Sequence, residues 1–166
     1  MHIRRATGAD IPGIVELEIQ NPGAARWSPQ QYEDLFSATS SPGPSERFAW
    51  VAEDESKDSP RKVPGEKCEL YAFLVTHRID AEWELENMVV AASVRRRGIG
   101  TLLLRELIAL VRAKNGKSIF LEVRSSNQGA RALYQKVGFE ELGLRKSYYQ
   151  NPSEDAILYR FSLDFS

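Results

Sequence analysis

The sequence lacks the residues for a disulfide framework, a cysteine-based metal cluster or a membrane span. Its 166 residues include one cysteine, Cys68, and two histidines, His2 and His77. A single thiol can neither form an internal disulfide nor build a cysteine metal site. No segment reaches the roughly 18 apolar residues that a membrane-spanning helix requires. We therefore expect a cytoplasmic protein that holds no metal and does not enter a membrane.

An excess of charge of either sign is also missing. The formal net charge is −1, with 27% charged and 42% hydrophobic residues, which is ordinary for a globular protein. This balance gives no reason to expect nucleic acid as a partner. The length favours a single domain over residues 1–166, as a monomer or a weak dimer. Residues 54–67 contain Pro60, Pro64, Gly65 and many charges, which predicts a long solvent-exposed hairpin loop rather than a domain boundary.

Hydrophobic periodicity predicts strands and helices in the order of an α/β sandwich with a mixed sheet. The expected order is strand, two helices, three strands, helix, strand, helix and two strands. Asp10, Ser28 and Asn127 suit helix N-caps, and Asn115 or Gly116 suits the left-handed end of the third helix. The clearest strands are expected at residues 48–53, 70–79, 83–90, 119–124 and 157–165.

A glycine turn lies between an expected strand and an expected amphipathic helix. Its residues are Arg95, Arg96, Arg97, Gly98, Ile99 and Gly100. Glycines leave backbone N–H groups uncovered near the positive end of a helix, and arginines add bidentate donors that suit phosphates. The plainer reading is a solvated basic turn, but the combination favours a phosphate site. The segment has no Gly-Lys-Ser/Thr and no third glycine at dinucleotide spacing, which disfavours nucleotide hydrolysis and hydride transfer.

The stretch from residue 87 to residue 156 carries a more specific resemblance. Residues 87–103 resemble motif A of the GNAT acetyltransferase superfamily, whose pattern is Arg/Gln-x-x-Gly-x-Gly/Ala. The similarity continues through residues 121–127, 132–134, 137–139 and 145–149, which read LEVRSSN, ALY, VGF and RKSYY. This longer set resembles the RimI branch, the bacterial ribosomal-protein-alanine N-acetyltransferases. One departure is the sequence AASV at 91–94, where the family commonly has Asp-Pro.

The resemblance implies a fold and a coenzyme. The fold would be a GNAT-like α/β structure, with a mixed, mostly antiparallel sheet of about seven strands and helices on both faces. The coenzyme would be acetyl-CoA, with its pyrophosphate on the glycine turn and its pantetheine arm on the preceding strand, where that strand splays from its neighbour. Backbone groups there would polarise the thioester carbonyl. The implied coenzyme-binding residues are Met88, Val89, Val90, Arg95, Arg96, Arg97, Gly98, Ile99, Gly100, Thr101 and Asn127.

Two side chains are candidates for proton transfer. Acetyl transfer needs a neutral amine before attack and a protonated thiol afterwards. The resemblance places the general base at Glu122 and the proton donor to the coenzyme sulfur at Tyr134. Taken alone, Glu122 could form a surface ion pair with Arg124, and Tyr134 could be an ordinary packed tyrosine. Glu84 and Glu86 are reserve bases, although both also suit ordinary strand-face carboxylates.

The expected acceptor is the α-amine of a protein N-terminus, such as the alanine of a small-subunit ribosomal protein. An α-amine has a pKa near 8 and lysine one near 10.4, so more of the α-amine is neutral at physiological pH. Trp27, Tyr148 and Tyr149 would line the peptide groove, with core or hairpin packing as the rival reading. The enzymatic alternative is acetylation of lysine, a polyamine or another small amine. The non-catalytic alternative is a CoA-binding sensor.

Overall fold

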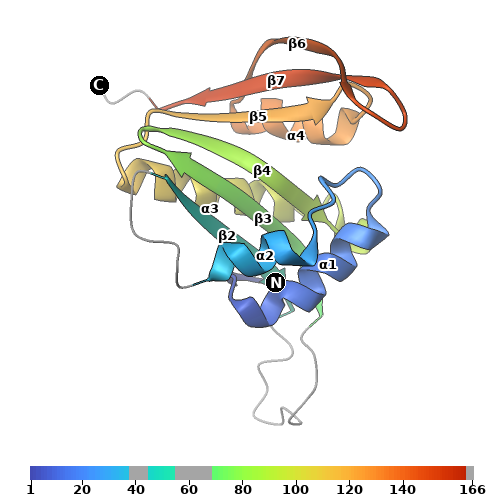
Figure 1. The fold of residues 1–166 in the computed structure, drawn as a ribbon. Coiled ribbons are helices and arrows are strands. Elements are labelled where there is room, and N and C mark those ends of the chain that lie inside the picture. Colours follow the sequence, from blue (N-terminus) through green and yellow to red (C-terminus); the bar gives the residue numbers. More distant parts are fainter. Residues whose placement is uncertain (38–44, 55–68, 164–166) are drawn as a thin grey trace.

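The computed structural model describes residues 1–37, 45–54 and 69–163 (Figure 1). Cys68, Phe165 and the expected loop from residue 55 onward lie outside these residues. The elements follow the predicted order. They are β1 (His2–Arg5), η1 (Gly8–Asp10), α1 (Ile11–Gln20), α2 (Pro29–Phe36), β2 (Ser45–Glu53), β3 (Leu70–Ile79), β4 (Glu82–Val90), η3 (Ala92–Val94), α3 (Ile99–Ala113), β5 (Ser118–Arg124), α4 (Gln128–Val137), β6 (Glu140–Tyr149) and β7 (Glu154–Ser162).

The strands form one seven-stranded sheet in the order β1-β2-β3-β4-β5-β7-β6. All neighbours are antiparallel except β4 and β5, which are parallel. Apolar residues of α1 and α2 pack in one core cluster, and those of α3 and α4 pack in another cluster on the opposite face. The prediction of a mixed, mostly antiparallel sheet with helices on both faces is therefore confirmed (Figure 1).

The central pair of strands separates along its length. β4 and β5 share a hydrogen-bonding register only where Glu82–Glu84 meet Ser118–Phe120. Beyond that point the two strands diverge toward their carboxyl ends (Figure 1). The sheet therefore opens beside Met88 and Val90, as the resemblance implied. Unpaired strand edges expose backbone donors and acceptors, so this opening can receive an extended polar ligand.

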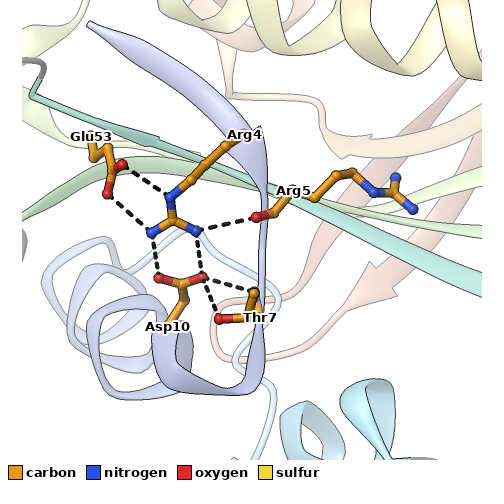
Figure 2. Close-up of polar contacts among 5 residues, drawn as sticks. All are labelled: Arg4, Arg5, Thr7, Asp10 and Glu53. Atoms are coloured by element: carbon orange, nitrogen blue, oxygen red, sulfur yellow. Dashed lines mark hydrogen bonds and ion pairs between the residues drawn. The ribbon is translucent and has the colours of Figure 1, made fainter.

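The start of α1 differs from the expectation in one respect. Asp10 stands at the N-cap position, but its side chain makes no capping hydrogen bond to α1. Its carboxylate instead accepts two hydrogen bonds from Arg4, both at 2.8 Å, and one from the Thr7 backbone. Arg4 also donates to Glu53 on β2, so one guanidinium joins β1, β2 and the entry to α1 (Figure 2). The Asp10 carboxylate thus serves the capping box of η1 and the ion pair with Arg4 instead of capping α1.

Other helix ends follow the sequence signals more closely. Ser28 and Gln31 form the predicted capping box of α2, and Asn127 accepts from the Ala130 backbone at the start of α4. At the end of α3, Asn115 takes the left-handed conformation with φ 55°. Gly116 has a different reason to be glycine, because an added Cβ would lie 2.5 Å from both Trp83 Nε1 and Val111 Cγ1.

Candidate active site

The glycine turn has the geometry of an anion site. Arg96 and Gly98 both adopt positive φ, 63° and 80°, and Gly98 is the N-cap residue of α3. The first intrahelical bond runs from Leu102 N–H to the Gly98 carbonyl, and the earlier N–H groups of a helix have no intrahelical acceptor. A Cβ added to Gly98 would meet nothing within 4 Å. Open space therefore lies over a turn whose amides can bind phosphate.

Gly100 and Thr101 complete the first turn of α3. Gly100 is buried, and a Cβ there would lie 2.8 Å from Leu133 Cδ2 of α4. Its small size therefore also permits close packing of α3 on α4. Ile99 points into the core at 3% exposure, so its contribution to the turn comes through its backbone.

The three arginines of the turn differ in their surroundings. The guanidinium of Arg95 donates from Nε to the Val90 carbonyl at 3.0 Å and from Nη2 to Asn21 Oδ1 at 2.7 Å. All three residues are exposed. Arg95 differs because its guanidinium is engaged with the protein itself.

The edge of β4 that faces the opening is available for hydrogen bonding. Ala91 donates its N–H to the Tyr71 carbonyl of β3. Hydrogen-bonded and non-hydrogen-bonded pairs alternate along antiparallel strands, so the backbone groups of Met88 and Val90 face β5. The Val90 carbonyl already accepts from Arg95, so the groups that this edge offers to a ligand are the Val90 N–H and the N–H and carbonyl of Met88. The Val89 side chain is buried against α1 and α2.

Glu122 lies in the middle of β5 with a partly exposed carboxylate. Its Oε1 is 3.0 Å from Nη1 of Arg145 on β6, and its side chain is 22% exposed. A hydrogen bond from Tyr148 to Glu122 raises the pKa of Tyr148. The alternative pair with Arg124 is not formed, because Arg124 lies 3.5 Å from Glu154 and stacks over Tyr149 at 4.3 Å. Glu122 therefore has a cationic partner that sequence reasoning did not identify.

Tyr149 has an electrostatic influence on Tyr134 and is itself influenced by Glu122. Tyr134 is 7% exposed on α4 and packs against Phe139 and Tyr159. Burial, and then the nearby Tyr149, raise the pKa of Tyr134. Burial raises the pKa of Tyr149 to about 12, with further contributions from the charge of Glu122 and from Tyr148. The two proposed proton-handling groups thus share one neighbour, and the Tyr134 hydroxyl stays protonated at neutral pH.

An acidic and aromatic surface flanks Glu122 on β4. Desolvation, and then repulsion from Glu86 and Glu122, raise the pKa of Glu84. Glu86 accepts two hydrogen bonds from Arg47, at 2.9 and 3.0 Å. The Arg47 guanidinium also lies 6.0 Å from the ring centroid of Trp27. Trp27 and Glu84 therefore belong to the same side of the sheet as Glu122, and Arg47 is a member that no sequence motif indicated.

One group of side chains has the composition of a metal site. Ligand atoms of His77, Glu84 and Glu86 all lie within 4.8 Å of one another. Two of these residues already have partners, because Arg47 binds Glu86 in a fork and the Ser45 hydroxyl lies 2.8 Å from His77 Nε2. Burial, and then the charge of Arg47, lower the pKa of His77, so its ring is neutral near pH 7.

The remaining predicted contacts have structural roles beside any functional ones. Asn127 caps α4 through its side chain, and it is exposed. Trp27 stacks at a tilt on Tyr32, with ring centroids 5.3 Å apart. Tyr148 is 48% exposed and meets Tyr149 edge to face. The structure brings Trp27, Tyr148 and Tyr149 to the side of the sheet that carries Glu122, whereas Asn127 stands at the end of β5.

Comparisons with known proteins identify the family. The model of the acetyltransferase (GNAT) family matches residues 14–139. The chain is 39% identical over 89 residues to the [ribosomal protein bS18]-alanine N-acetyltransferase of Salmonella typhimurium. This alignment covers 52% of this chain and 60% of the relative. It is 43% identical over 79 residues to the N-alpha-acetyltransferase RimI of Mycobacterium tuberculosis, and this alignment covers 48% of each chain. The alignments thus span 60% or less of these curated relatives.

Solved structures extend the likeness over almost the whole chain. The crystal structure of the ribosomal-protein-S18-alanine N-acetyltransferase from Escherichia coli matches with a TM-score of 0.74 and 25% identity, covering 99% of this chain and 95% of the other. Arabidopsis thaliana NAA60 in complex with a bisubstrate analogue matches with a TM-score of 0.79 at 17% identity, covering 99% of both chains. Among the described residues, no helix is long and apolar enough to cross a membrane.

Proposed function

The chain belongs to the acetyltransferase (GNAT) family, and from this premise we propose that it transfers acetyl from acetyl-CoA to the α-amine of a protein N-terminus. The acceptor favoured by its similarity to named relatives is the N-terminal alanine of a ribosomal protein. The observation that carries the proposal is the opening between β4 and β5, because the glycine turn follows the carboxyl end of β4 and Glu122 lies on β5 at the other edge. The protein would act in the cytoplasm, as a single domain over residues 1–166.

The coenzyme would lie along the opening between β4 and β5. Its pyrophosphate would accept hydrogen bonds from the N–H groups at the start of α3, from Gly98 to Thr101, with Arg96 and Arg97 supplying positive charge. Its pantetheine amide groups would bond to the edge of β4 around Met88. Asn127, at the carboxyl end of β5, would contact the coenzyme from the other strand. Acetyl-CoA would be a co-substrate, and no metal would be needed.

The reaction would be a direct transfer with no covalent enzyme intermediate. The amine nitrogen forms a bond to the acetyl carbon, the carbon–sulfur bond breaks, and two protons move. Glu122 would accept the amine proton through a water molecule, and Tyr134 would donate its hydroxyl proton to the departing sulfur. Because the free carboxylate is paired with Arg145 at 3.0 Å, the acceptor amine and Arg145 would compete for Glu122.

The raised pKa of Tyr134 limits how the sulfur is protonated. An ordinary tyrosine with a pKa near 10 donates to a free thiolate of pKa near 8.5 at a cost of about 2 kcal/mol. Burial raises the pKa of Tyr134 further, so stepwise donation to a free thiolate would cost more. Proton transfer would therefore accompany carbon–sulfur cleavage, while the sulfur still carries only part of its negative charge.

The acceptor peptide would enter beside Trp27, Tyr148 and Tyr149. Their rings offer apolar surface to the first residues of a peptide. Glu84 lies near Glu122 without an ion-pair partner in the described part of the chain, so its carboxylate can attract the protonated amine. The α-amine is the favoured acceptor because a larger fraction of it is neutral than of a lysine side chain.

Mass spectrometry of acetylated peptides tests the proposal. Peptides beginning with Ala, Ser or Met would be incubated with acetyl-CoA and the protein, beside a peptide whose only amine is an internal lysine. Acetylation at the α-amine, fastest for alanine, is the expected result. Exclusive acetylation of the lysine would instead support the small-amine or lysine alternative, and binding of acetyl-CoA without any product would support a sensor.

Glu122→Gln tests the base assignment. We expect kcat to fall by about 10²–10⁴-fold, the usual contribution of a general base, with the Kd for acetyl-CoA nearly unchanged. Glu82→Gln is the matched control, because Glu82 is an exposed carboxylate at the start of β4 and should leave kcat near the wild-type value. Full activity of Glu122→Gln across the pH range would refute the assignment.

A further inference from the structure

The loop between α1 and α2, residues 21–28, is tied to the proposed coenzyme strand at two separate points. One tie runs from the glycine turn through Arg95 to Asn21, and the other runs from β4 through Asn87 to Glu18. Figure 1 shows the chain leaving α1 near the carboxyl end of β4. Because the same loop carries Trp27, its position bears on where an acceptor peptide would lie.

The first tie uses both ends of the Asn21 side chain. Asn21 Nδ2 donates to the Leu17 carbonyl at 2.6 Å, and Oδ1 accepts from Arg95 Nη2 at 2.7 Å. An amide has only one acceptor end, and Arg95 can only donate, so these two bonds determine the orientation of the Asn21 amide. Asn21 is 8% exposed. The bond to Arg95 is charge-assisted and partly buried, which makes it one of the stronger kinds of side-chain contact.

The second tie is a buried carboxylate beneath the loop. Glu18 is 4% exposed, and its Oε1 accepts from the Trp27 backbone N–H and from Asn87 Nδ2, both at 2.9 Å. Asn87 also donates to the Tyr32 hydroxyl at 3.1 Å. The register of β4 against β3 shifts next to Asn87, where Val75 pairs with Asn87. The Trp27 end of the loop is thereby fixed to β4, while the Asn21 end is fixed to the glycine turn.

From these contacts we propose that Arg95 is a positioning residue for the acceptor rather than a phosphate ligand. Arg95 and Asn21 form a clasp that holds residues 21–28 against β4. The clasp thereby fixes the position of Trp27 relative to Glu122. This inference rests on the proposed function, because it concerns the placement of the acceptor in that reaction. Small displacements of a bound substrate can cost about 10²-fold in rate, so a clasp remote from the reacting atoms can matter.

The two roles of an arginine at this position predict different kinetics. A phosphate ligand contributes to acetyl-CoA affinity and should leave the acceptor KM unchanged once acetyl-CoA is saturating. A clasp contributes to the acceptor KM and kcat, and the effect of Arg95 should depend on the presence of Asn21. Arg97 is exposed and makes no hydrogen bond or ion pair that is recorded for the described residues, so it is the matched arginine for comparison.

Three variants would be measured with acetyl-CoA and an alanine-starting peptide. Arg95→Met and Asn21→Ala should each raise the peptide KM by about tenfold or more, as expected for loss of a hydrogen bond to a charged group. The Kd for acetyl-CoA, from calorimetry, should change by less than about threefold. Arg97→Met should do the reverse, weakening acetyl-CoA while leaving the peptide KM at saturating acetyl-CoA unchanged.

The double variant Arg95→Met/Asn21→Ala shows whether the two residues act as one unit. Its increase in peptide KM should be well below the product of the two single increases, because both changes break the shared Arg95–Asn21 bond and only the bonds to the Val90 and Leu17 carbonyls are lost separately. If the increase in peptide KM of the double variant equals the product of the two single increases, the clasp is refuted. Loss of acetyl-CoA affinity in Arg95→Met equal to that in Arg97→Met, with an unchanged peptide KM, would overturn it also and make Arg95 a phosphate ligand.

Hydrogen exchange separates failure of the clasp from failure of the proposed function. In the free protein the Ala24 amide donates to the Asn21 carbonyl at 2.9 Å, and the Trp27 amide donates to Glu18. Arg95→Met and Asn21→Ala should both speed exchange at residues 21–28 without changing it in α3. If the wild-type protein acetylates no peptide but this exchange pattern is found, the clasp stands and the acceptor assignment falls. Unchanged exchange at residues 21–28 would refute the clasp whatever the activity.

Discussion

Replacing Arg4 with methionine should expose how much stability one guanidinium supplies. Arg4 donates to both oxygens of Asp10 at 2.8 Å and to both oxygens of Glu53 at 3.0 Å (Figure 2). The side chains of Arg4, Asp10 and Glu53 are 30%, 9% and 17% exposed. Methionine keeps most of the side-chain volume but removes the charge and all donors. Two carboxylates, one of them nearly buried, would then lose their common partner.

The size of the effect follows from this exposure. Removing one partner of a fully buried ion pair costs about 3–5 kcal/mol. Arg4 is 30% exposed and water can reach the site after truncation, so we expect a loss at or below the lower end of this range, about 2–3 kcal/mol of the free energy of unfolding. For a domain of this length, each kcal/mol shifts Tm by about 2–4 °C. The variant should therefore melt roughly 5–10 °C below the wild type.

The loss should depend on pH in a defined direction. Burial by itself would raise the pKa of Asp10, but the hydrogen bonds from Arg4 and Thr7 outweigh it and lower the pKa. A carboxyl with a depressed pKa stabilises the fold above its unfolded value, near 4, and loses that contribution as the pH falls through the folded value. The difference between the wild type and Arg4→Met should therefore be full at about pH 7 and should shrink below about pH 4.

Urea unfolding followed by tryptophan fluorescence measures this difference at each pH. Arg105→Met is the control, because Arg105 is exposed on α3 and its loss should change stability by no more than about 0.5 kcal/mol. A difference for Arg4→Met equal to that of the control would contradict the reasoning. So would a large difference that does not shrink as the pH falls below about 4 toward the depressed pKa of Asp10.

Three further changes test other parts of the molecule. Gly98→Ala should lose about 1 kcal/mol of stability from its left-handed backbone, but by calorimetry acetyl-CoA should bind at least about tenfold more weakly if phosphate lies over the turn. Gly116→Ala forces a Cβ to within 2.5 Å of Trp83 and Val111, so urea unfolding should show a loss of about 2 kcal/mol. Tyr134→Phe should lower kcat by about 10²-fold or more. Because the pKa of Tyr134 is raised, wild-type kcat should show no alkaline loss below about pH 10, and a loss near pH 8 would exclude Tyr134 as the acid.

The order of elements could be predicted because its signals are local. Apolar spacing along a helix and alternation along a strand are set by residues a few positions apart. The capping box of Ser28 and Gln31 is a signal of the same kind, and it forms as expected. Asn115 likewise takes the left-handed conformation that was expected of Asn115 or Gly116 at the end of the third helix. These features needed no knowledge of which strands are neighbours.

The contacts of the site could not be predicted because they join distant parts of the chain. Arg145 reaches Glu122 only because β7 lies between β5 and β6 in the sheet. Asp10 shows that a partner nearby in the sequence can also be missed. Its position suited a cap of α1, but the guanidinium of Arg4, six positions away, offered a stronger, charge-assisted pair. The engagement of Arg95 by Asn21, 74 positions away, has no signature in the glycine motif.

The split between β4 and β5 also determines where the fold is weakest. β5 and β7 are bonded along the whole of Ser118–Arg124, but β4 and β5 share bonds only over their first residues. Under heat or mechanical load, the two halves of the sheet should part along this line before either half loses its own strands. A coenzyme bound between β4 and β5 would contact both strands. Its binding should therefore stabilise the sheet at the place where the two strands are not hydrogen-bonded to each other.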